Sequence, residues 1–226
     1  MTALLHQADA LLRPREDSDA ATALAFRART LVALLICFGI VYGAMMGLFY
    51  GYDESPRPLQ AFFSATKVPL LLLLTFALAL PSFYVLNMLA GLAPDFPAVL
   101  RALLATQAGL TVVLASLGPF TLLFYASTTN YDAAILFNAA MFALASLAGQ
   151  RLLSRFYAPL IARDSRHRKM VRVWILLYAF VGIQMGWILR PFIGDPDKPT
   201  TFFRQGAWGN AYVEVWNKAL GAAHGD

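Results

Sequence analysis

Six polar side chains interrupt otherwise apolar stretches of this 226-residue chain, and they are its first candidates for chemistry. They are Lys67, Asn87, Gln107, Asn138, Gln184 and Arg190. Lys67 could line a path for an ion or a solute, because a charge at membrane depth is expensive and usually serves a function. Near a membrane surface it could instead snorkel to water or pair with Asp53, Glu54 or Asp132. Both interpretations stay open.

The other five polar side chains suggest packing rather than catalysis. Amide side chains inside membrane helices commonly hydrogen-bond between helices, each contributing under about 1 kcal/mol. We expect this role for the four Asn and Gln residues. Arg190 either anchors the nearby acidic residues Asp195 and Asp197 or simply marks the edge of the membrane.

Motifs of catalysis and cofactor binding are absent from the sequence. It contains no P-loop, no dinucleotide-binding glycine fingerprint, no His-Glu-x-x-His and no Gly-x-Ser-x-Gly. His6, His167 and His224 lie in separate segments outside the apolar runs. The single Cys37 excludes an intrachain disulfide and disfavours a thiolate metal site. We therefore expect a protein that is not an enzyme and that has no cofactor or metal site.

Composition places the chain in a membrane. It is 59% hydrophobic and only 14% charged, with a mean hydropathy of +0.59, which is too apolar for an ordinary soluble domain. The net charge of +5 comes from Lys and Arg residues that lie mostly in the gaps between apolar runs. Membrane topology explains this arrangement, so we expect no nucleic-acid partner.

The apolar runs predict an all-α polytopic bundle of about five transmembrane helices, because each run is long enough to cross about 30 Å of hydrocarbon. Pro69 and Pro81 predict a kinked or tilted second span, and Gly118-Pro119 a break near the end of the third. The first run begins too late for a typical cleaved signal peptide, so we interpret it as a retained anchor. The runs cover about residues 30–51, 59–90, 99–125, 133–150 and 171–189.

Two terminal segments flank the transmembrane domain of residues 30–190. Within residues 1–29, the first twelve form a short amphipathic helix and the rest a polar linker. The helix could lie on the membrane surface or pack against the bundle. Residues 191–226 form an irregular tail that ends in a short helix over 211–220. We expect its aromatic residues to cap the outer end of the bundle; they are Phe202, Phe203, Trp208 and Trp216.

Positive charge orients the bundle. With the N-terminus inside, 12 of the 18 Lys and Arg residues lie on the inner side, as the positive-inside rule requires. We expect a multi-pass protein of the bacterial inner (plasma) membrane, with a cytoplasmic N-terminus and an extracytoplasmic C-terminus. The densest basic tract explains this topology, and it could also recruit anionic lipid or a cytosolic partner. It comprises Arg163, Arg166, Arg168, Lys169 and Arg172.

A ridge of glycines marks the first span. Gly39, Gly43, Gly47 and Gly51 recur at every fourth position, so on a helix they form one flat face that lets another helix approach closely. A second small-residue face, at Gly182 and Gly186, lies in the fifth span, and a third is formed by Ala145 with Gly149. We expect the ridge to pack within one chain, with the first and fifth spans adjacent. Packing between subunits is the alternative.

The pattern of five closely spaced spans, a polar cytoplasmic N-terminus and an outward C-terminus resembles the Ypt-interacting-protein (Yip) family and its bacterial relatives. The Ser-Pro-x-Pro-Leu-Gln stretch from Ser55 to Gln60 and the Lys67-Val-Pro69 entry to the second span are similar to bacterial members. The Asp-Leu-Tyr-Gly-Pro motif of eukaryotic members is absent, so the resemblance does not extend to their Rab GTPase partners. It implies a noncatalytic role in membrane organisation.

Two functions follow from these observations. The first is a noncatalytic scaffold or accessory subunit, held in the lipid bilayer and bound to a membrane-protein partner or to further copies of itself. The second is a small channel or transporter in which Lys67, Asn87 and Gln184 share a polar path.

Overall fold

A computed structural model describes residues 2–13, 26–49, 58–195, 198–204 and 207–213 of the chain. These residues form an all-α bundle, and five of the helices are long and apolar enough to cross a membrane. The chain is therefore a multi-pass membrane protein. Its helices are α1 (Thr2–Leu12), α3 (Ala28–Met46), α4 (Pro58–Leu89), the 3-10 turn η1 (Ala93–Asp95), α5 (Phe96–Ser127), α6 (Tyr131–Arg163) and α7 (Arg166–Leu189).

The predicted runs correspond to the five long helices, although α3 already ends at Met46 and α7 already begins at Arg166. Two further differences concern the third and fourth spans. The third span does not break at Gly118-Pro119, because α5 continues through both residues to Ser127. The fourth span does not end near residue 150 but continues to Arg163. The arginines beyond position 150 mark where the chain leaves the apolar layer, and they do not interrupt the apolar helical face of Leu153, Phe156 and Leu160.

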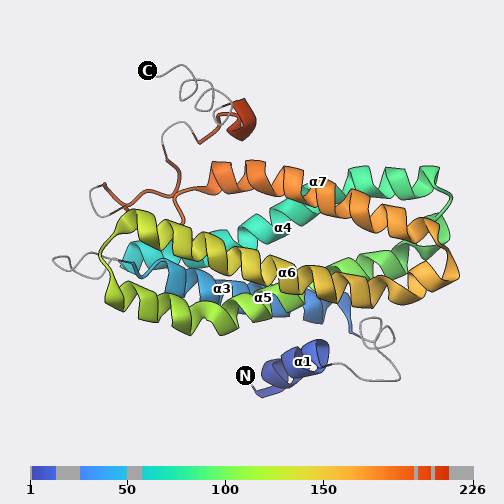
Figure 1. The fold of residues 1–226 in the computed structure, drawn as a ribbon, viewed down its shortest axis with the longest axis horizontal. Helices are drawn as coiled ribbons and strands as arrows, with labels where there is room; N and C mark the ends of the chain where they lie inside the picture. Colours follow the sequence, from blue (N-terminus) through green and yellow to red (C-terminus); the bar gives the residue numbers. More distant parts are fainter. Residues whose placement is uncertain (1, 14–25, 50–57, 196–197, 205–206, 214–226) are drawn as a thin grey trace.

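The helix α5 occupies the centre of the bundle. It packs against α3 and α6, while α4 packs against α3 and α7. Figure 1 shows the long helices running along the length of the molecule, with α4 crossing obliquely. We call the end where α7 stops at Leu189 the cap end, and the end that carries the turns 90–95 and 164–165 the turn end.

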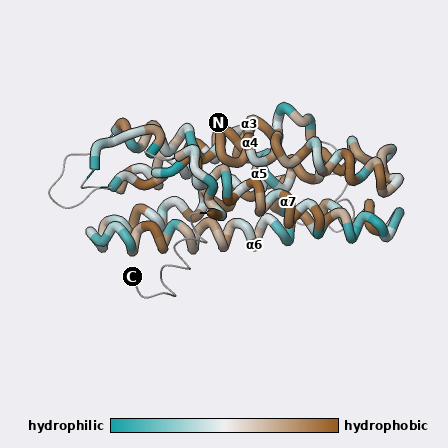
Figure 2. The backbone as a smooth tube through the Cα atoms, turned by 90° about the horizontal axis from the view of Figure 1, so that it is seen from above, coloured by the Kyte–Doolittle hydropathy of each residue, from teal (hydrophilic) through white to brown (hydrophobic). Residues whose placement is uncertain are grey.

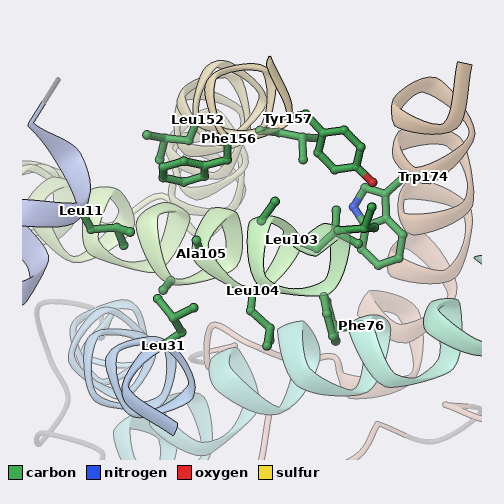
Figure 3. Close-up of a cluster of buried hydrophobic side chains, with 14 of the residues drawn as sticks. Leu11, Leu31, Phe76, Leu103, Leu104, Ala105, Leu152, Phe156, Tyr157 and Trp174 are labelled. Atoms are coloured by element: carbon green, nitrogen blue, oxygen red, sulfur yellow. The ribbon is translucent and has the colours of Figure 1, made fainter. Parts of the chain in front are cut away.

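Buried apolar side chains from all the helices converge on α5. Figure 3 shows Leu103, Leu104 and Ala105 of α5 between side chains of the neighbouring helices. Trp174 of α7 packs edge to face against Phe76 of α4, with ring centroids 5.5 Å apart. Figure 2 shows many hydrophobic positions along the middle of the long helices, with hydrophilic ones mainly toward the two ends. Large hydrophobic side chains are exposed on the outer surface, among them Leu78, Leu136 and Leu176. This outer surface is what a bilayer would cover.

The glycine ridge of α3 packs within the chain, against α4. A Cβ added to Gly43 would lie 2.8 Å from the Cα of Ala65, and one added to Gly47 would lie 2.6 Å from the Cα of Ala61. A Cβ added to Gly39 would lie 3.2 Å from the Cβ of Pro69. Only glycine lets these two backbones approach so closely. Gly51 lies outside the described residues.

The prediction that the glycine ridge of the first span packs against the fifth span is wrong. Gly182 of α7 faces Thr75 of α4, and a Cβ added to Gly186 would meet nothing within 4 Å. Gly149 of α6 faces Leu110 of α5. The small residues of α6 and α7 therefore serve other contacts, because α4 supplies the partner of the ridge.

The N-terminal helix α1 packs on the bundle. Its Leu11 is fully buried in the core around α5. The guanidinium of Arg155 on α6 donates hydrogen bonds to the carbonyls of Leu11 and Leu12 at 3.2 Å and of Arg13 at 3.3 Å. These carbonyls end α1 and have no partner within the helix. Of the two placements that the sequence left open, the structure shows the one against the bundle.

Gly43→Ala should destabilise the monomer, because the added methyl group would push α3 away from α4. We expect a loss of about 1–3 kcal/mol in the free energy of unfolding, measured by denaturant titration in detergent. Gly186→Ala is the matched control; it should keep or slightly raise stability, since alanine is the better helix former. A Gly43→Ala monomer of full stability that fails to self-associate would place the ridge between subunits.

Arg155→Gln should release α1 from the bundle. The lost hydrogen bonds to three carbonyls are charge-assisted and worth about 1.5–3 kcal/mol each at most, so amide exchange within α1 should rise at least about tenfold. Arg151→Gln, at an exposed position one turn earlier on α6, is the control. Equal protection of α1 in both variants would contradict this account of the contact.

Candidate functional site

The chain that leaves α7 folds over the cap end and is held there by side chains. Lys67 donates from its Nζ to the carbonyl of Pro191 at 2.6 Å. Ser64 and Gln60 both donate to the carbonyl of Phe192, the latter at 3.2 Å. These three donors lie on α4 at positions i, i+4 and i+7, which is one face of a helix. We call them the donor face.

Two further contacts complete this arrangement. Tyr131 of α6 donates to the carbonyl of Ile193 at 3.4 Å, so three consecutive carbonyls each receive a side-chain hydrogen bond. A Cβ added to Gly194 would lie 2.9 Å from the Cγ of Gln60. The segment 191–194, which we call the clamped segment, is therefore packed closely onto α4 and α6.

Lys67 is buried beneath the clamped segment. Its side chain is 0% exposed, so it does not snorkel to water, and its ammonium lies 4.8 Å from the ring centroid of Phe202. A carbonyl and an aromatic face both stabilise a cation. Of its expected partners, Asp53 and Glu54 lie outside the described residues, and Asp132 is an exposed residue in the first turn of α6. Lys67 thus acts as a structural donor to the clamped segment.

Charged residues surround the clamped segment. Arg190 stacks on Trp187, with its guanidinium carbon 3.3 Å from the ring centroid. Asp195 accepts a hydrogen bond from Lys198 at 2.6 Å, and Arg204 approaches it at 4.0 Å. Asp197, the second acid expected near Arg190, lies outside the described residues. The cap end therefore carries Arg190, Lys198 and Arg204 in addition to Lys67.

A line of aromatic rings leads outward from α4. Phe202 packs on Phe63 with ring centroids 5.2 Å apart, and Phe203 follows it at 4.8 Å. Trp208 lies 5.7 Å beyond Phe203 and is 79% exposed. Trp216, and the predicted helix beyond residue 213, lie outside the described residues. The structure thus brings three of the four predicted tail aromatics together at the cap end.

Of the polar residues within the spans, Asn138 and Gln107 form hydrogen bonds between helices. Asn138 of α6 accepts from the hydroxyl of Tyr42 on α3 at 3.2 Å and donates to that of Tyr125 on α5 at 2.6 Å. Gln107 of α5 accepts from Tyr178 of α7 at 3.0 Å. These bonds connect four helices at membrane depth.

The other two amides behave differently. Asn87 donates only to Phe83 of its own helix, at 2.8 Å, and its Oδ1 is buried without a partner among the described residues. Gln184 binds the chain beyond α7, donating to Gly209 at 3.1 Å and accepting from the amide of Ala211 at 3.0 Å. Neither residue bridges two long helices. Gln184 instead fixes the outer tail.

The basic tract lies across the turn end. Arg163 pairs with Asp95 at 2.7 Å, and His167, fully buried, also contacts Asp95 at 3.2 Å. Arg166 binds Asp164 at 2.7 Å, and its hydrogen bonds hold the pKa of Asp164 below its usual value. His167 belongs to α7, so its expected position outside the spans is wrong. All five residues of the tract are exposed, but only Arg163 and Arg166 pair with these acids.

Two cavities lie along α6. The first, of about 410 Å³, is near the cap end and is bordered by Arg190, Arg204 and mainly apolar side chains. The second, of about 360 Å³, lies between α4, α5, α6 and α7 and includes Thr75, Gln107 and Gln150. Lys67, Asn87 and Gln184 line neither of them. In the part of the chain that the structure describes, no three His, Cys, Asp or Glu residues come together in a way that could hold a metal ion.

Sequence reasoning missed Gln60, Ser64 and the pair His167 and Asp95. The spacing of Gln60, Ser64 and Lys67 on one face of the second span was a usable signal. Nothing in the sequence linked His167 to Asp95, because Asp95 precedes α5 whereas His167 lies in the first turn of α7.

No protein-family model, curated protein or solved structure matches this chain. Its function must therefore be argued from its own residues.

Lys67→Met should loosen the clamped segment without unfolding the bundle. Methionine fills a similar volume without the desolvation cost of a buried ammonium group, so the bundle should stay folded. Losing one charge-assisted hydrogen bond, worth about 1.5–3 kcal/mol, should nevertheless speed proteolytic cleavage between residues 190 and 204 at least about tenfold. Lys169→Met at the turn end is the control. Cleavage at the wild-type rate in Lys67→Met would show that Lys67 does not hold this segment.

Proposed function

We propose that this chain is a noncatalytic integral membrane protein that serves as a scaffold or accessory subunit of a membrane complex. The role is the one implied by its resemblance to Yip-like proteins. In this proposal it lies in a bacterial inner membrane, with the turn end in the cytoplasm and the cap end outside. The concentration of Arg and Lys at the turn end supports that orientation.

The proposal rests mainly on the aromatic side chains of Phe202, Phe203 and Trp208, which are held in place at the cap end. The clamped segment is held by side chains of α4 and α6, and Gln184 and Tyr212 hold the tail beyond Trp208. Tyr212 donates to the carbonyl of Phe180 at 2.5 Å. An exposed tryptophan on an ordered segment loses little conformational entropy when a partner binds. Tryptophan is also one of the residues that most often dominate the binding energy of protein interfaces.

A second contact with the surroundings is proposed at the turn end. All five basic residues of the tract are exposed there, and Arg163 and Arg166 are engaged in ion pairs. Arg168, Lys169 and Arg172 suit the anionic lipid headgroups of a cytoplasmic leaflet. They would fix the depth of the scaffold in the membrane.

The channel interpretation has less support. Lys67 and Asn87 lie twenty positions apart on α4, which is about 30 Å along a helix. Lys67 is also covered by the clamped segment. A solute flux through reconstituted vesicles that Lys67→Met abolishes would nevertheless favour a channel over a scaffold.

Trp208→Ala tests the scaffold. Native complexes should be isolated in a mild detergent, and the partner or second copy identified by mass and by mixing differently tagged chains. Loss of a central anchor should weaken association at least about thirtyfold, corresponding to about 2 kcal/mol. Phe120→Ala, another exposed aromatic near the cap end, should leave association unchanged.

Either of two results would contradict the proposal. One is a wild-type protein that remains a lone monomer under every mild condition. The other is a complex that both variants keep equally well, which would leave Trp208 as an ordinary residue of the membrane interface.

A further inference from the structure

The two cavities along α6 form successive parts of one groove. Both are bordered by Leu71 of α4 and Phe142 of α6, so the first ends where the second begins. The groove follows the side of the bundle where α6 and α7 have few contacts. We consider the part nearer the cap end, which we call the cap cavity.

The walls of the cap cavity are mainly apolar. They include Met46, Leu71, Ile135, Ala139 and Phe142 from three helices. Ile135 is 43% exposed and Ala139 is also exposed. Since α6 is a membrane-spanning helix, exposed side chains at this depth face lipid. The cavity is therefore accessible from within the bilayer.

The mouth of the cap cavity is positively charged. Arg190 and Arg204 border it, and Lys198 lies beside them on Asp195. Arg204 approaches Asp195 only to 4.0 Å. Cationic side chains therefore lie next to an apolar wall. An amphiphile with an anionic head and a hydrocarbon tail complements both features.

The length of the cap cavity fits one leaflet. On α6 its lining extends from Tyr131 to Phe142, which is about 17 Å of helix. Half of the hydrocarbon core of a bilayer is about 15 Å thick. An acyl chain whose headgroup lies at the level of Arg190 would therefore reach about to Phe142.

We propose that the cap cavity binds one anionic phospholipid from the leaflet on that side of the membrane. Its phosphate lies between Arg190 and Arg204, and one acyl chain follows Leu71 and Ala139 toward Phe142. This site is distinct from the exposed basic residues of the turn end, which lie at the opposite end of the bundle. It does not depend on the proposed scaffold function.

Ala139→Trp tests the apolar half of the site. The purified protein in detergent is incubated with phosphatidylglycerol or with phosphatidylcholine of the same acyl chains, and bound lipids are counted by native mass spectrometry. Tryptophan at position 139 should fill the cavity and weaken the tightest phosphatidylglycerol binding at least tenfold. Ala140→Trp, at the next exposed position of α6 and outside the cavity lining, should not change it.

Arg204→Gln tests the charged half, and it remains informative if Ala139→Trp does not fold. It should weaken phosphatidylglycerol binding about fivefold, as expected for one interfacial charge, and leave phosphatidylcholine unaffected. Lys169→Gln at the turn end should leave the tightest-bound phosphatidylglycerol in place. Equal retention of the two lipids by the wild type would overturn the proposal. So would equal binding by Ala139→Trp and Ala140→Trp, or unchanged binding by Arg204→Gln.

Discussion

Where a helix ends in an apolar setting, the backbone carbonyls at that end need hydrogen-bond donors from elsewhere. This requirement governs how the chain is arranged after α7 and at the end of α1. After α7, the carbonyls of Pro191, Phe192 and Ile193 receive hydrogen bonds from side chains of α4 and α6. After α1, Arg155 supplies donors to three successive carbonyls. In the first case polar residues on long helices fix the segment that follows α7, and in the second Arg155 fixes the last turn of α1.

The same turns of α4 support both the bundle and the cap. The backbone around Ser64 and Ala65 is in close contact with Gly43 of α3, while the side chain of Ser64 donates to the clamped segment. The approach of α3 to α4 therefore fixes the donor face. A buried lysine at this place is explained by the carbonyl and the aromatic ring that it contacts.

Hydropathy predicted the fold class and the number of spans because every long helix must satisfy its own backbone in lipid. It failed at α6, where arginines beyond residue 150 suggested an end although the apolar face continued. The glycine spacing in α3 predicted a close contact but could not identify its partner, because spacing says nothing about which helix lies opposite. For that reason Gly182 and Gly186 were paired with the ridge, whereas α4 is its neighbour.

The candidate site was predicted only in part. The tail aromatics were expected at the cap end, and Phe202, Phe203 and Trp208 lie there in one connected line. Their support, the donor face and the clamped segment, depends on contacts between residues more than a hundred positions apart. Local sequence patterns do not encode such pairings, so the role of Lys67 could be found only from the structure.

Measuring the contact between Lys67 and Pro191 tests most directly whether Lys67 holds the clamped segment on α4. Solid-state NMR on protein in bilayers, with ¹⁵N in lysine side chains and ¹³C in proline carbonyls, reports the distance between the two nuclei. The 2.6 Å hydrogen bond and a carbonyl bond of about 1.23 Å bound that distance below about 4 Å. The account predicts a strong dipolar coupling that disappears in Lys67→Met. A wild-type spectrum without this coupling would contradict it.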